Sequence, residues 1–195
     1  MVSALWWFLM PSADESARAA LVVAGAAALA LFFFRRPSRN FTWDELTTTN
    51  TGLPNQPNIE QRFRLILLAR QVLQPLRDEF GPIRVTSAFR SGPVNAAVGG
   101  TGGNCVRSEG GKPCSLHTAG SAVDLYSMEG ATAEHMATWL YLHPEIPIAE
   151  AIIEPTGHLH LGRDSGGAPG ARRFLQTQDM RTYTAWMPSA PMLVS

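Results

Sequence analysis

One long amphipathic segment, followed by a series of short apolar runs, decides which folds this chain can adopt. Across residues 59–80, apolar side chains recur at steps of three and four residues, which is the period of a helix with one buried face. Four runs of strand length follow: residues 83–88, 122–126, 148–153 and 158–161. A second helical stretch covers residues 132–142, and the tail at 172–186 can add one more strand. We therefore predict a single α+β domain with a mostly antiparallel sheet and flanking helices.

The ends of the long predicted helix are marked by residues with clear capping chemistry. Asn58 immediately precedes the helix, and its side chain can accept hydrogen bonds from the first turn. Gly81 and Pro82 follow its last turn and end it. Pro75 lies inside the helix, where its missing N–H and its ring disturb the preceding turn, so it should kink or split the helix.

An uncharged run at residues 19–34 lies outside this domain and is flanked by Arg18 and Arg35. A helix over this run rises about 24 Å, and the flanking arginines can extend it toward a hydrocarbon core of about 30 Å. We predict one N-terminal transmembrane helix that contacts the lipid bilayer through residues 19–34, and hence a single-pass membrane localisation. A cleaved signal peptide is disfavoured by Asp14 and Glu15 upstream. A buried core helix is the remaining alternative.

The predicted organisation along the chain has three parts. Residues 1–36 form the membrane anchor. Residues 37–58, rich in Pro, Thr and Asn, form a linker and an irregular lead-in segment. Residues 59–195 form the folded domain.

The charge balance excludes one class of partner. The chain has 16 basic and 16 acidic residues, and its formal net charge is zero. It contains no basic run of the kind that contacts a phosphate backbone. We therefore predict that it has no nucleic-acid partner.

Two cysteines, Cys105 and Cys114, lie in a glycine-rich stretch. A disulfide between them would close a short loop and imply an oxidising compartment. Two free thiols are the alternative. A third interpretation makes Cys114 a metal ligand, because it stands three residues before His117. All three stay open.

Two histidines alternate in one strand-like run. His158 and His160 are separated by one leucine, so they project from the same face of a strand. Upstream, His117 is followed by Asp124, with Gly120 between them for a tight turn. Taken singly, each residue has a purely structural explanation. Together, two imidazoles and a carboxylate with an open fourth position are the ligand set of a catalytic zinc. We predict one zinc ion per chain, bound by His117, Asp124 and His160.

These residues resemble two motifs of the zinc D-Ala-D-Ala carboxypeptidase and Hedgehog superfamily. The first motif covers residues 115–124 and the second covers residues 154–160, while residues 85–100 are similar to an upstream segment of the same family. The likeness spans residues 41–186. It implies an α+β zinc peptidase that cleaves peptidoglycan stem peptides as a carboxypeptidase or an endopeptidase. Phage endolysins, used for host lysis or infection, are one setting in which such enzymes occur.

We also predict roles for three residues around the metal. Glu154 is expected to act as the general base and His158 to donate a hydrogen bond to the developing oxyanion. The planar fork of Arg90 is suited to clamp a substrate carboxylate, with an ordinary ion pair as the alternative. The chain departs from many relatives at Gly157, where they carry the catalytic carboxylate. The position of Glu154, six residues before His160, matches the Hedgehog-like spacing instead.

A different function class is a non-catalytic, zinc-stabilised binding domain tethered to a membrane, and a membrane scaffold with a vestigial domain is a third. For the enzyme, the substrate lies on the periplasmic or cell-wall side, so the domain is expected to act there. The positive-inside rule instead places Arg35, Arg36 and Arg39, with the domain that follows them, in the cytoplasm. The sequence leaves this conflict open.

Overall fold

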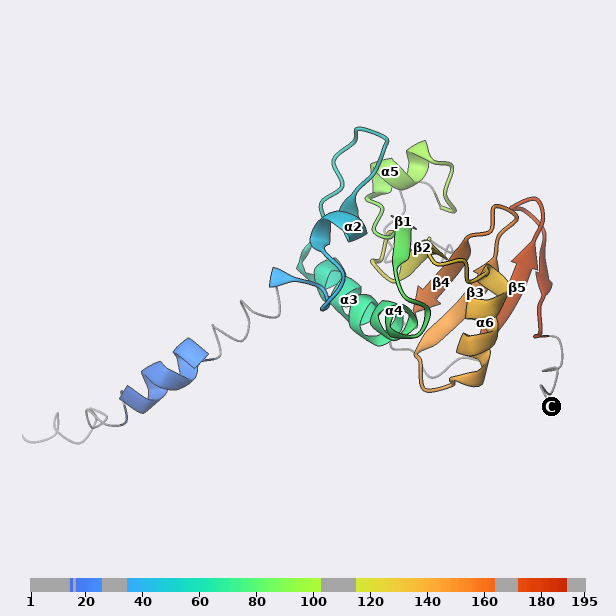
Figure 1. Cartoon of the computed structure of the whole chain (residues 1–195). Coiled ribbons are helices and arrows are strands. Elements are labelled where there is room, and N and C mark those ends of the chain that lie inside the picture. The colour runs from blue at the N-terminus through green and yellow to red at the C-terminus, as the bar shows by residue number, and fades with distance from the viewer. Residues whose placement is uncertain (1–14, 16, 26–34, 103–114, 164–171, 189–195) are drawn as a thin grey trace, which may run out of the picture. The chain divides into compact units, whose positions relative to one another are not determined.

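The computed structural model describes residues 15, 17–25, 35–102, 115–163 and 172–188 (Figure 1). The chain divides into two units, residues 1–36 and 37–195, and each is described by itself. Cys105 and Cys114 lie outside the described residues, so the interpretations of this pair stay predictions.

The N-terminal unit corrects one prediction. Within it, residue 15 and residues 17–25 are helical. Residues 26–34 of the predicted span lie outside the described residues. In the part of the chain that the structure describes, no helix combines the length and the apolar character needed to cross a membrane. The predicted transmembrane helix over residues 19–34, and the single-pass membrane localisation that depended on it, are therefore wrong.

Six strands of the second unit form one mixed sheet in the order β1-β2-β4-β3-β5-β6 (Figure 1). The strands are β1 (Ile83–Ser87), β2 (Ala122–Ser127), β3 (Ile148–Ile153), β4 (Leu159–Arg163), β5 (Arg173–Thr177) and β6 (Tyr183–Ala185). Neighbouring strands are antiparallel, except for β3 and β5, which are parallel. The unit is therefore α+β, and the tail of the chain supplies the two strands β5 and β6.

The long predicted helix is present but interrupted just before Pro75. It consists of α3 (Ile59–Leu68), a π-helical turn η1 (Ala69–Leu73) and α4 (Gln74–Phe80). In the π turn the backbone N–H of Gln74 donates to the oxygen of Ala69, five residues back, and this register change directly precedes the proline that has no N–H. At the other end, Asn58 caps the helix as predicted, accepting a hydrogen bond from the backbone N–H of Gln61 at 2.9 Å.

The described residues of the unit contain three further helices: α2 (Trp43–Thr47), α5 (Gly92–Ala97) and α6 (Ala133–Leu142). The sequence predicted an irregular segment where α2 forms. A signal for it was present, because Thr42 and Glu45 form a capping box in which each side chain accepts a hydrogen bond from the backbone N–H of the other. Phe41 and Leu46, on either side of this cap, are buried in the core.

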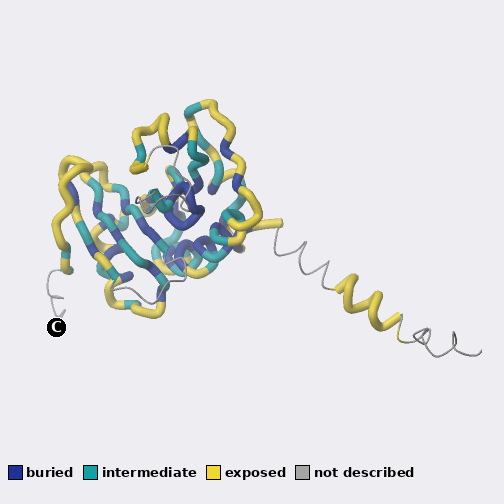
Figure 2. Tube along the Cα trace, turned by 180° about the vertical axis from the view of Figure 1, so that it is seen from behind, coloured by how far each residue is buried: buried dark blue, intermediate teal, exposed yellow. Residues whose placement is uncertain are grey.

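Alternating side chains give the central strands one core face and one face with polar groups. Figure 2 shows buried and half-buried residues alternating along these strands. The buried residues of β2, β3 and β4 belong to the core cluster shared with α3, α4 and α6: Val123, Leu125, Ala151, Ile153, Leu159 and Leu161. Asp124 and His160 lie at the intervening positions. They therefore project from the opposite face of the sheet.

Candidate metal centre

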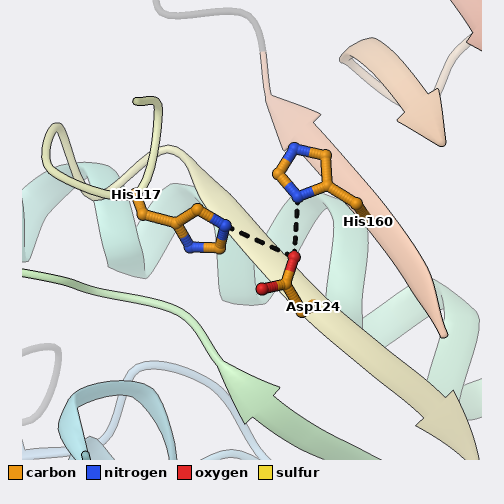
Figure 3. Close-up of side chains that lie close together, drawn as sticks. All are labelled: His117, Asp124 and His160. Atoms are coloured by element: carbon orange, nitrogen blue, oxygen red, sulfur yellow. Dashed lines mark hydrogen bonds and ion pairs between the residues drawn. The ribbon is translucent and has the colours of Figure 1, made fainter. Parts of the chain in front are cut away.

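The three predicted ligands converge from three separate segments (Figure 3). His117 lies in the turn before β2, Asp124 lies in β2 and His160 lies in β4. Oδ1 of Asp124 is 2.7 Å from Nδ1 of His160 and 3.3 Å from Nε2 of His117. One ligand atom from each side chain lies within 4.8 Å of the others. The three groups thus surround a single point.

Strand pairing fixes two of these side chains relative to each other. Asp124 and His160 are direct partners in the antiparallel ladder between β2 and β4. Directly opposite residues in such a ladder project to the same face of the sheet with neighbouring Cβ atoms. Their approach is therefore set by backbone hydrogen bonds and not by a flexible loop.

The turn that carries His117 is held against helix α3. Gly120 has a φ of +71°, which favours glycine, and a Cβ there would lie only 2.8 Å from the backbone oxygen of Gln61. The side-chain amide of Gln61 donates to the backbone oxygen of Thr118 at 3.0 Å. The glycine thus permits both the turn and its close approach to the helix.

The surroundings of His117 select the ring nitrogen that faces the site. Nδ1 of His117 lies 2.6 Å from the backbone oxygen of Ala88. Because a carbonyl oxygen can only accept, Nδ1 carries the proton and Nε2 presents its lone pair toward Asp124. Burial lowers the pKa of His117. The neutral ring, which is the form that binds a metal, is therefore favoured.

His160 has a carboxylate on each side of its ring. Nδ1 faces Asp124 at 2.7 Å, and Nε2 lies 3.6 Å from Oε1 of Glu150. Burial lowers the pKa of His160, but the interactions with Asp124 and Glu150 outweigh burial and raise it to about 9. Without a cation the ring therefore holds both protons at neutral pH, and a metal bound at Nδ1 would take the place of one of them.

Asp124 is ionised and held at both oxygens. Burial raises its pKa, but His117 and His160 together outweigh burial and keep the pKa well below its usual range. Oδ2 accepts a hydrogen bond from Nη2 of Arg90 at 2.6 Å, and Nε of Arg90 donates to Oγ of Ser87 at 2.8 Å. Of the two interpretations of Arg90, the structure thus contains an ion pair, made with a candidate ligand.

This donor set fits zinc. Two imidazole nitrogens and one carboxylate oxygen are a common protein ligand set of catalytic zinc sites, in which the fourth position is open to water or substrate. Each ligand also has a second polar group beside it: the backbone oxygen of Ala88 for His117, Arg90 for Asp124 and Glu150 for His160. Such groups orient the ligands in known zinc sites.

A comparison with protein families agrees with this geometry. The family model of peptidase M15 matches residues 39–161, which is more than half of the chain. The chain belongs to the peptidase M15 family. The matched segment contains all three candidate ligands and Glu154, and the resemblance predicted from the two motifs is thus confirmed. No curated protein matches the chain. M15 peptidases are zinc enzymes, so this chain is by family a metallopeptidase.

In this M15 peptidase, Glu154 and His158 lie in the turn between β3 and β4. The side chain of Glu154 is 12% exposed, and burial raises its pKa, with a further contribution from the charge of Asp124. Nδ1 of His158 is 2.9 Å from Oγ1 of Thr156 and 3.9 Å from Oε2 of Glu154. The ring of His158 lies against Tyr126, with 5.4 Å between ring centroids. The predicted base and the predicted oxyanion donor are thus neighbours.

A cavity of about 460 Å³ adjoins Glu154 in the M15 peptidase. It lies between the turn after β3, the first turn of α6 and the end of β5, and Gly157, Thr132 and Gln176 contribute to its walls. Glu154 is therefore on the wall of this cavity, whereas none of the three candidate ligands lines it.

Glu150 of the M15 peptidase is a neighbour of the site that was not predicted from the sequence. This residue lies in β3, with Oε1 next to His160 and Oε2 paired with Arg173 of β5. A signal was available. Glu150 and Glu154 stand four residues apart in an otherwise apolar run. Because side chains alternate along a strand, Glu150 projects to the same face as Glu154 at the end of the run. Which histidine Glu150 meets depends on the strand order.

Proposed function

We propose that this M15 peptidase hydrolyses peptide bonds in the stem peptides of bacterial peptidoglycan, as a carboxypeptidase or an endopeptidase, with one zinc ion held by His117, Asp124 and His160. The convergence of these three side chains on one point carries the proposal, and family membership supports it. Zinc in this position would lower the pKa of a bound water and polarise the scissile carbonyl. The same hydrolysis would serve a phage during lysis or infection.

Glu154 is the general base of the proposed reaction. Its carboxylate would accept the proton of the attacking water and deliver it to the leaving amine. The burial that raises its pKa brings the group closer to the pH at which it must both accept and release a proton. Its closeness to Asp124 and His160, whose charges both act on its carboxyl group, supports this role.

His158 is the proposed donor to the oxyanion. The hydroxyl of Thr156 can donate to Nδ1, which leaves the N–H of the neutral ring at Nε2. The side chain of His158 is 31% exposed, so this N–H can reach a substrate. Such a donor stabilises the charge that develops on the carbonyl oxygen.

Arg90 has two tasks in the proposal. Its contacts to Asp124 and Ser87 use Nη2 and Nε, and a guanidinium carries five N–H donors in all. The same side chain can therefore hold a metal ligand in place and offer a donor to a substrate carboxylate.

Digestion of purified peptidoglycan by the full chain tests the function. Mass spectrometry of the released fragments should show cleaved stem peptides and identify the bond, and a chelator should stop their release until zinc is added back. A chain that gains stability from zinc but releases no fragments would contradict the proposal and favour the non-catalytic binding domain.

A further inference from the structure

We propose that Glu150 is a positioning residue for the metal centre: it holds the Nε2 proton of His160, so that the lone pair of Nδ1 is presented to the cation. This inference rests on the proposed function, because it assigns a role in zinc binding to a residue outside the predicted ligand set.

The geometry of the His160 ring is the first argument. Its two nitrogens face two different carboxylates, with Nδ1 at 2.7 Å from Asp124 and Nε2 at 3.6 Å from Glu150. A histidine ligand has one nitrogen on the metal, and the proton on the other is usually held by a carboxylate, a carbonyl or water. Asp124 is itself a candidate ligand. Glu150 is therefore the carboxylate suited to hold the proton.

Arg173 holds the carboxylate of Glu150 in its place. The two residues are direct partners in the parallel pairing of β3 and β5, and their side chains form an ion pair through Oε2 of Glu150. Oε1 is thus turned toward His160. Strand β5 follows the segment matched by the family, so Arg173 reaches the site from a strand beyond residues 39–161.

Gly162 leaves the space that Glu150 occupies. It pairs with Glu150 across β3 and β4, two residues beyond His160. A Cβ at Gly162 would lie 2.8 Å from Cγ of Glu150 and 2.6 Å from Cδ1 of Leu116, closer than atoms can pack. Because position 162 has no side chain, Glu150 can lie across strand β4 beside His160.

Removal of the Glu150 side chain should lower the zinc affinity although all three predicted ligands remain. In Glu150→Ala the His160 ring has lost the partner that distinguishes its two nitrogens, so zinc affinity should fall by about 10- to 100-fold, as for other partners of metal-bound histidines. Glu150→Gln keeps an oxygen that can accept a hydrogen bond from Nε2 of His160, so its zinc affinity should fall by less. Arg173→Gln changes a side chain that is 65% exposed and should weaken zinc binding in the same direction by a smaller factor.

Competition with a chromophoric chelator measures zinc affinity on the full-length chain and these variants. Glu60→Gln is the matched control, because Glu60 also pairs with an arginine, Arg64, but lies on the exposed side of α3. If the zinc affinity of Glu150→Ala stays within about twofold of that of the original chain, the inference is overturned. Unfolding midpoints without metal show whether a variant is folded.

Nitrogen-15 NMR of the zinc-loaded original chain gives a test that needs no variant. The inference expects His160 to coordinate through Nδ1 and to carry a proton on Nε2, and coordination through Nε2 would overturn it. An original chain that binds no zinc would overturn the proposed function as well. A chain that binds zinc and cleaves peptidoglycan, but is indifferent to Glu150, would overturn this inference alone.

Discussion

Arg90 and Asp124 form an ion pair in which Nη2 of the arginine lies 2.6 Å from Oδ2 of the aspartate. This contact occupies one oxygen of the carboxylate, and the other, Oδ1, faces the two imidazoles of the candidate site. Arg90 therefore leaves Oδ1 as the oxygen that faces the two imidazoles. We expect a residue that was predicted to bind substrate to orient a candidate metal ligand as well.

Arg90→Lys should weaken zinc binding by about tenfold or more, because a lysine ammonium cannot hold Asp124 and Ser87 together as the guanidinium fork does. Chelator competition measures this effect. The substrate role predicts in addition a larger rise in KM for a peptide with a free carboxylate than for its amide. Arg84→Lys, on the exposed side of β1, is the control. Unchanged zinc affinity in Arg90→Lys would show that the ion pair does not orient Asp124.

His117→Ala should abolish both bound zinc and hydrolysis, because it removes one of three ligands from the site. Metal analysis of the purified protein and an assay on peptidoglycan check the two effects. His135→Ala, at an exposed position of α6, should leave both unchanged. Full activity of the His117 variant without zinc would rule out the metal mechanism.

Glu154→Gln should keep zinc while kcat falls by about 10²- to 10⁴-fold, the usual contribution of a general base. The base acts when deprotonated. For the original chain, kcat/KM should therefore rise with pH through a pKa above 4.5, the ordinary value for glutamate, since burial raises the pKa of Glu154. This rise should disappear in the variant. Glu134→Gln, on the wall of the neighbouring cavity, is the control, and a variant with near-normal kcat would place the base elsewhere.

The metal-free chain should lose stability as pH rises from about 6.5 to about 9. The pKa of His160 is raised to about 9 in the folded chain, whereas the unfolded chain titrates near 6.5. Between these values the folded state binds more protons, so the free energy of unfolding falls with rising pH, by up to about 3 kcal/mol. Denaturant titrations with chelator present measure the loss. With zinc bound the fall should vanish, because the metal replaces the Nδ1 proton, and a metal-free chain with flat stability over this range would contradict the protonation assigned to His160.

Gly120→Ala should destabilise the chain more than Gly52→Ala. Both glycines have a φ of +71°, so both variants incur the backbone strain of about 1–2 kcal/mol expected for a left-handed alanine. Only the Cβ at position 120 would also collide with the backbone oxygen of Gln61, since nothing lies within 4 Å of the Cβ at position 52. The difference between the two variants in thermal unfolding measures the destabilisation caused by the close approach of position 120 to α3. Equal losses would show that the His117 turn can move away from α3.

Local patterns in the sequence predicted those features that depend on local physics. The apolar period of residues 59–80 and the cap at Asn58 predicted the long helix, and the proline effect predicted its interruption before Pro75. Strand alternation predicted a shared face for His158 and His160, but His158 lies in the turn before β4 and only His160 lies in the strand. The four predicted strands in the body of the chain form, with ends that differ from the prediction by at most two residues.

Features that depend on the pairing of strands distant in the sequence could not be predicted. Glu150 meets His160 only because β4 lies between β2 and β3, and a strand order cannot be deduced from periodicity. The partner of Arg90 could not be chosen for the same reason, since Asp124 reaches it through the pairing of β1 and β2. The predicted membrane span rested on the apolar character of residues 19–34 alone. Apolar composition alone does not establish a helix that crosses a membrane, and none of the described helices has the length and apolar character to do so.

The direct pairing of Asp124 with His160 in the β2–β4 ladder has an evolutionary consequence. Substitutions at the other positions of the turn that carries Glu154 and His158 leave the backbone pairing of these two ligands unchanged. We expect natural diversity to accumulate at those other positions, and substrate preference to be open to redesign there without rebuilding the strand pairing that holds Asp124 and His160.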